Sequence, residues 1–63
     1  MDYRVSYEHS LVSAPEDFIV QVPSQLVGDV PANIPRALLP EFIGELILSR
    51  SPQIGRIRRL RIL

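Results

Sequence analysis

The chain of 63 residues contains no cysteine and no tryptophan, and it also lacks lysine and threonine. Without cysteine it has no disulfide and no thiolate metal site to stabilise so short a sequence. Every basic side chain is an arginine, whose planar, permanently charged group suits paired or interfacial positions. A compositional bias of the source genome would give the same pattern, and the sequence leaves both explanations open.

Long apolar runs are missing as well. No stretch approaches the roughly 20 apolar residues that a membrane span requires. The first four residues lack the cationic and apolar segments of a secretory signal. We therefore expect no transmembrane segment and a cytoplasmic location, or a place in a virion if the source is a virus or phage.

The formal net charge is zero, from seven basic and seven acidic residues, and 46% of the residues are hydrophobic. This composition excludes a uniformly basic nucleic-acid binder and disfavours disorder. A domain of this length buries only about 60% of the surface of its unfolded chain, so its core is small. We predict a single small domain, 1–63, of the α+β class, with a core completed by oligomerisation or by docking on a larger protein.

Residues 2–22 predict a small N-terminal β-hairpin. Over residues 2–8, odd-numbered positions are mostly apolar or aromatic and even-numbered positions are polar, a period typical of a half-buried strand. The segment 13–17 has the proline and short polar residues of a turn. Residues 18–22 predict the second strand, which Pro23 ends or places at an edge of the sheet, since proline cannot donate a ladder hydrogen bond.

Residues 23–35 predict an irregular, proline-rich docking loop. Three prolines interrupt it, but apolar residues lie between them. A solvated linker would be polar, so the apolar residues indicate packing on the core or on another chain. We predict that Leu26, Val27 and Val30 contact a partner.

Residues 39–50 predict one amphipathic helix. Apolar residues recur there at spacings of three and four, and Glu41 and Glu45 fall on the opposite side, one turn apart. Pro40 is tolerated in the first turn, and the Ser-Pro pair after residue 50 ends the helix. Gly44 suggests a close approach of the helix to the sheet.

The C-terminal segment, residues 54–63, is ambiguous. As a strand in strict alternation, it places arginines and apolar residues on both faces. As a helix, it gives a drifting apolar stripe that includes Ile57 and Leu60, but ten residues are too few for a stable isolated helix. We predict a basic strand and leave a helix open, with Ile57 and Leu60 as further partner contacts.

Charge is distributed unevenly along the chain. Residues 1–48 carry all seven acids and two arginines, a balance of −5, whereas residues 49–63 carry +5 and no acid. The five C-terminal arginines are Arg50, Arg56, Arg58, Arg59 and Arg61. They predict either pairing with acidic groups of this chain or a partner, or binding to nucleic-acid phosphates. Interleaved isoleucine and leucine, without aromatic residues for base stacking, favour the first; an anionic lipid surface is a third possibility.

No catalytic constellation is evident. His9 is the only histidine, and in a strand its neighbours Glu8 and Ser10 point to the other face. A single histidine among scattered acids does not predict a metal site, and the three glycines fit no phosphate-binding loop. We therefore predict no enzymatic activity, no cofactor, no metal and no small-molecule substrate.

Two alternating segments open the chain: Met1-x-Tyr3-x-Val5-x-x-Glu8 and Asp17-Phe18-x-Val20-x-Val22-Pro23. They resemble the opening hairpin of the HicB-like antitoxin family over about the first 23 residues. The resemblance implies a small sheet with a helix and inhibition of an RNase toxin. The Gly-Cys turn and the Gly-Asp-Thr helix entry of that family are not reproduced.

Taken together, these features predict a non-catalytic protein–protein interaction module. It would be an adaptor, an inhibitor or a structural subunit of a larger assembly. The alternative is a small nucleic-acid-associated or antitoxin-like regulator that uses the C-terminal arginines.

Overall fold

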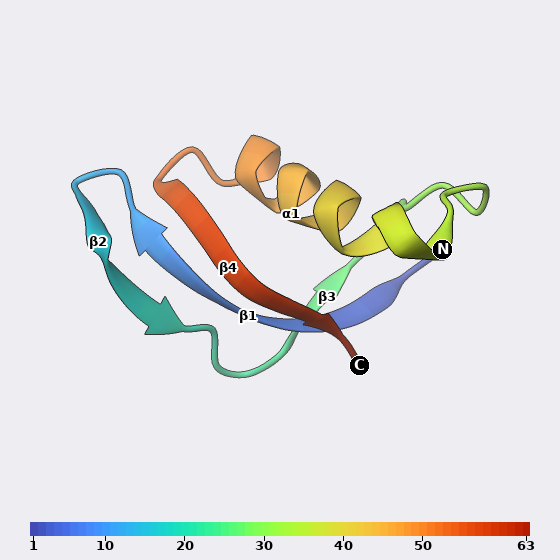
Figure 1. The fold of residues 1–63 in the computed structure, drawn as a ribbon, viewed down its shortest axis with the longest axis horizontal. Coiled ribbons are helices and arrows are strands. Elements are labelled where there is room, and N and C mark those ends of the chain that lie inside the picture. The colour runs from blue at the N-terminus through green and yellow to red at the C-terminus, as the bar shows by residue number, and fades with distance from the viewer.

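The computed structural model describes all 63 residues, which form one antiparallel sheet of four strands and a single α-helix (Figure 1). The elements, in chain order, are β1 (Tyr3–Leu11), β2 (Ala14–Val20), β3 (Gln25–Val27), the short 3-10 helix η1 (Arg36–Leu38), α1 (Leu39–Arg50) and β4 (Ile54–Ile62). The predicted α+β class, with a hairpin, one helix and a C-terminal strand, is confirmed.

β1 is the central strand of the sheet. β4 pairs with it from Val5 to Leu11, whereas β2 pairs with its C-terminal half and β3 with its N-terminal half. Because a strand has only two edges, β2 and β3 must share the edge of β1 that β4 leaves free. The sheet is therefore three strands wide, with β1 in the centre, β4 on one side, and β2 and β3 sharing the other side.

The hairpin turn lies earlier than the sequence predicts. Residues 14–17 belong to β2 rather than to a turn, and β2 ends at Val20. An edge strand tolerates Pro15 because its missing N–H can face solvent. Between the pairs His9–Ile19 and Leu11–Ala14, one residue of β1 faces four residues of β2, so the extra residues form an irregular bulge.

β4 contains two bulges that explain its irregular pattern. Its pairing with β1 shifts by one residue at Gly55 and again near Arg59. Arg59 has a φ of 54°, the left-handed conformation found at the first position of one type of bulge. Each bulge inserts one residue, so four apolar residues share the face that packs on the core: Ile54, Ile57, Leu60 and Ile62. If side chains alternated strictly along β4, as the sequence analysis assumed, these four residues would not lie on the same face.

The core lies between α1 and one face of the sheet. Leu39, Ile43 and Ile47 recur at every fourth position and are buried, as expected for one stripe of a helix. They pack with four buried residues from β1, β3 and the following loop: Val5, Tyr7, Val27 and Val30. α1 does not have the length and apolar character that crossing a membrane would require.

Gly44 does not mark a tight contact. A Cβ built there would lie 3.9 Å from its nearest neighbour, Leu60 Cδ1, which is an ordinary van der Waals distance. The prediction of a close approach of the helix to the sheet at this position is therefore wrong.

The segment 23–35 folds onto its own chain. Part of it forms β3, the Val30 amide donates a hydrogen bond to the Met1 carbonyl over 3.0 Å, and Arg50 donates one to the Gly28 carbonyl over 3.1 Å. Val27 and Val30 are only 2% and 1% exposed. Their predicted contact with a partner is therefore corrected, because both side chains close the chain's own core.

Candidate interaction surface

The sheet face opposite α1 is covered by no other element (Figure 1). In β1, Val5 and Tyr7 are buried on the helix side. Because side chains alternate along a strand, Arg4, Ser6 and Glu8 must point to the opposite side. β1 therefore contributes a row of polar side chains along the centre of the uncovered face.

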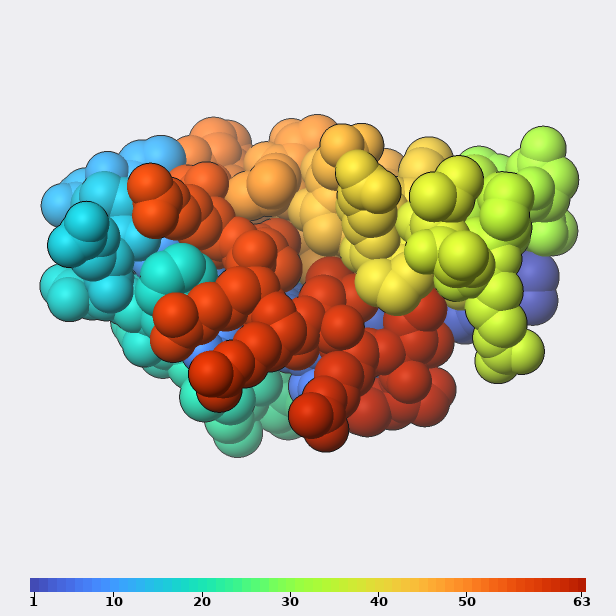
Figure 2. Space-filling view, viewed as in Figure 1, coloured from blue at the N-terminus to red at the C-terminus, as the bar shows by residue number.

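The pairing of β4 with β1 adds arginines to this face. Arg61 pairs with Ser6, Arg58 with Glu8 and Arg56 with Ser10. Arg59 belongs to a bulge, but its side chain also reaches Glu8. We call this surface the arginine face, and its basic residues are Arg4, Arg56, Arg58, Arg59 and Arg61. In the space-filling view, residues of β4 spread across the visible side between α1 and the β2–β3 segment (Figure 2).

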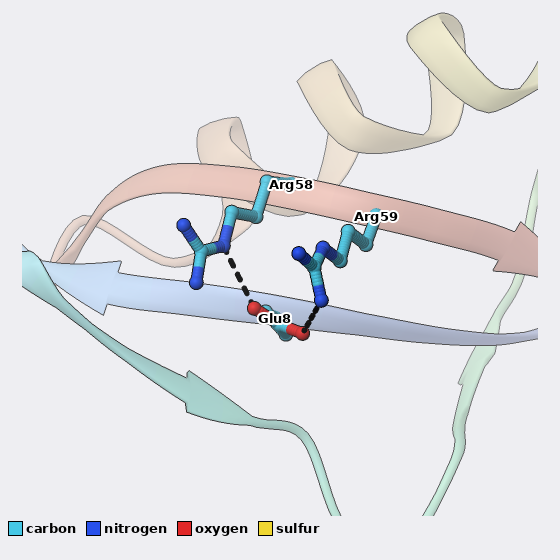
Figure 3. Close-up of polar contacts among 3 residues, drawn as sticks. All are labelled: Glu8, Arg58 and Arg59. Carbon is cyan, nitrogen blue, oxygen red and sulfur yellow. Dashed lines mark hydrogen bonds and ion pairs between the residues drawn. The ribbon is translucent and has the colours of Figure 1, made fainter.

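Two of these arginines share the carboxylate of Glu8 (Figure 3). Arg58 Nε donates to Glu8 Oε1 over 2.7 Å, and Arg59 Nη1 donates to Glu8 Oε2 over 3.4 Å. The hydrogen bond from Arg58, together with the charges of both guanidinium groups, lowers the pKa of Glu8 below its ordinary value. Glu8 thus stays ionised and holds two long side chains over the sheet.

Arg58 also occupies the face of an aromatic ring. Its guanidinium carbon lies 3.9 Å from the centre of the Phe18 ring, within the range of a cation–π contact. Phe18 therefore does not present a free ring for another group to stack on.

The remaining arginines of the face have no carboxylate partner. Arg56 and Arg61 are exposed and form no ion pair, and Arg4 donates only to the carbonyl and hydroxyl of Ser24, both over 3.4 Å. Two exposed aliphatic side chains lie on the same side, since Leu26 pairs with Arg4 and Val20 pairs with Glu8. The arginine face thus combines free cations with apolar surface.

The structure brings together some of the residues predicted from the sequence and separates others. Arg56, Arg58, Arg59, Arg61 and Leu26 meet on the arginine face. Ile57 and Leu60 are partly buried and pack against the core on the other side of β4, so they do not join it. Arg50 lies at the end of α1 and binds the Gly28 carbonyl.

Sequence reasoning missed Arg4 and Val20 as members of the site. A signal for Arg4 was present, because the alternation at the start of the chain already places it with Ser6 and Glu8, away from the apolar side. The link to the distant arginines was missing, since it depends on the pairing of β1 with β4. Val20 joins them through its pairing with Glu8.

The structure assembles no acid–base or metal site around His9. Glu8 is bound by two arginines, and the ring of His9 lies 5.9 Å from the ring of Tyr7. The Ser10 hydroxyl and His9 Nδ1 are buried without hydrogen-bond partners. No group of three or more histidine or carboxylate side chains is placed to hold a metal ion.

Comparison of the chain with protein-family models, with curated proteins and with solved structures finds no match. The resemblance of the first 23 residues to HicB-like antitoxins therefore stays a prediction. The arginine face is the surface feature from which a function can be proposed.

Proposed function

We propose that this protein is a non-catalytic protein–protein interaction module, acting as an adaptor, an inhibitor or a structural subunit. Its arginine face would bind a partner surface that carries carboxylates and some apolar side chains. One observation carries the proposal: a sheet face without a covering element holds five arginines, and only two of them are paired with a carboxylate, that of Glu8.

The architecture supports a covering partner. An α+β unit of two layers leaves one sheet face in water, and a second layer on that face would bury apolar area that this small core lacks. Leu26 and Val20 are 56% and 59% exposed, and both lie next to arginines. Arginine suits such an interface because its flat group binds carboxylates through two parallel hydrogen bonds.

Binding to nucleic acid is the second candidate, since the unpaired guanidinium groups of Arg56 and Arg61 could equally contact phosphates. The surroundings favour a protein. Proteins that hold single strands stack bases on free aromatic rings, but the Phe18 ring is engaged by Arg58 and Tyr7 is buried.

Fluorescence anisotropy with two probes tests the proposal. One probe is a labelled peptide of alternating glutamate and leucine, and the other is a labelled single-stranded RNA. We expect the peptide to bind more tightly than the RNA at moderate salt. The double variant Arg56→Ala/Arg61→Ala should weaken peptide binding by about tenfold or more, as for loss of interfacial charge pairs.

Arg50→Ala is the matched control, because Arg50 is an exposed arginine at the end of α1 that donates to the Gly28 carbonyl and lies outside the arginine face. It should leave peptide affinity within about twofold of the unaltered chain, the usual range for an isolated surface charge. Equal weakening by Arg50→Ala would contradict the proposal. Tighter binding of the RNA, with a steep loss of affinity as salt rises, would favour the nucleic-acid alternative.

A further inference from the structure

We infer that the partner of the arginine face is a second copy of this chain, which docks the outward ridge of its α1 there. The inference rests on the proposed function and names the partner. It follows from the charges and spacing of two surfaces that form no ion pair with each other within one chain.

The outward ridge of α1 is acidic at its centre and apolar at its ends. Glu41 and Glu45 lie two residues on either side of the fully buried Ile43, so each points about 160° around the helix from the core. Both are exposed and neither forms an ion pair. Leu38, which is 53% exposed, precedes them, and the partly exposed Leu48 follows them at the other end. We call these four residues the acidic ridge.

The spacing of the acidic ridge fits the arginine face. Residues four apart on a helix are separated by about 6 Å along its axis, which is the separation of Glu41 and Glu45. Residues two apart on a strand, such as Arg56 and Arg58, are separated by about 6.7 Å. Arg58 uses only Nε on Glu8, so its other N–H groups are available to a second carboxylate.

Both surfaces also carry apolar side chains. Leu38 and Leu48 lie at the two ends of the acidic ridge, and Val20 and Leu26 lie beside the arginines, on the β2–β3 side of the sheet. Docking would cover aliphatic surface on both copies around a central set of charge pairs. Because the chain has a net charge of zero, two copies do not repel each other through their overall charge.

Within one chain, the acidic ridge and the arginine face form no ion pair with each other, although Glu41 and Glu45 line a hollow together with Arg58. Their charged groups therefore stay open to a second molecule. Each copy therefore offers one surface of each kind, and the resulting contact is heterologous. Contacts of this type add copies head to tail rather than closing a symmetric dimer.

Sedimentation velocity over the micromolar to millimolar range tests the inference. The unaltered chain should gain mass with concentration at low salt and lose it at moderate salt, because exposed charge pairs are screened. Glu41→Arg/Glu45→Arg should weaken the association by about tenfold or more, and Arg56→Glu/Arg61→Glu should do the same. In an equimolar mixture, the reversed acidic ridge of one variant meets the reversed positions 56 and 61 of the other, and the two variants should associate again.

Asp17→Arg is the control, because it reverses an exposed acid of β2 that lies outside both the acidic ridge and the arginine face. It should leave the association unchanged. A monomeric unaltered chain, or a mixture of the two charge-reversed variants that stays monomeric, would overturn the inference. If the chain is monomeric but still binds the acidic peptide through Arg56 and Arg61, only this inference fails; if neither occurs, the proposed function fails with it.

Discussion

Glu8 and Arg58 face each other across β1 and β4, and the Arg58 Nε donates a hydrogen bond of 2.7 Å to the Glu8 carboxylate. They are fifty residues apart in the chain. This ion pair therefore forms only when β4 is paired in register with β1. It also fixes one arginine and, through the second oxygen of Glu8, its neighbour Arg59.

Replacing Glu8 should weaken the fold only where the carboxylate is ionised. Its pKa is lowered in the folded chain, mainly by the Arg58 hydrogen bond. A carboxyl of this kind contributes stability above its unfolded pKa, and this contribution is lost as pH falls through the lower folded value. Glu8→Gln should thus lower Tm at neutral pH, with the difference shrinking in acid. Circular dichroism melts across that pH range provide the measurement, and a difference that does not change with pH would contradict the assignment.

Gly55→Ala should destabilise the protein. A Cβ at this bulge position would lie 3.2 Å from Val12 Cα and 3.3 Å from Val12 Cγ1. The first neighbour is backbone, so the turn between β1 and β2 must shift. Overpacking of this kind costs about 1 to 3 kcal/mol, which urea denaturation can measure.

Gly44→Ala is the matched control for that measurement. It has room for a Cβ and lies inside α1, where alanine is favoured over glycine by about 1 kcal/mol. The two substitutions should therefore change the free energy of unfolding in opposite directions. A loss of stability at both positions would contradict the geometry of the helix–sheet contact.

Ser10→Ala should leave stability unchanged or increase it. The Ser10 side chain is fully buried, and its hydroxyl has no hydrogen-bond partner. Such a group carries a desolvation cost of about 1 to 3 kcal/mol without a compensating bond. A clear loss of stability in urea denaturation would indicate that the hydroxyl is bonded, for example to a buried water molecule.

Tyr7→Phe should have the opposite effect, although it also removes a single hydroxyl. The Tyr7 hydroxyl donates to Oε1 of Gln25, and burial raises its pKa. Losing this bond leaves the amide oxygen without a partner and should cost about 1 kcal/mol. The same denaturation experiment measures it, and equal stability of the variant and the unaltered chain would show that the bond contributes nothing.

The elements with a regular period could be predicted from the sequence. The spacing of Leu39, Ile43 and Ile47 gives the helix and its buried side, and the alternation around Val5 gives the first strand. The set of β4 residues that faces the core could not be derived, because two inserted residues each shift the alternation of side chains by one position. Bulges depend on the partner strand, and local periodicity does not record them.

The candidate site was predictable only in part. The run of arginines near the C-terminus is visible in the sequence, and so is the polar side of β1. Their meeting depends on pairing between segments at opposite ends of the chain. Among the apolar residues of the proline-rich segment, burial separates Val27 and Val30 from Leu26, and this separation comes from the tertiary fold alone.

The bulges at Gly55 and near Arg59 have a consequence for aggregation. A straight outer strand is a template on which further chains can add by continuing the hydrogen-bond ladder, as in amyloid fibrils. Interrupted strands and a proline on the opposite border, such as Pro15, hinder that addition. The molecule is thereby protected from sideways growth into fibrils, even though one broad surface of its sheet stays open to water.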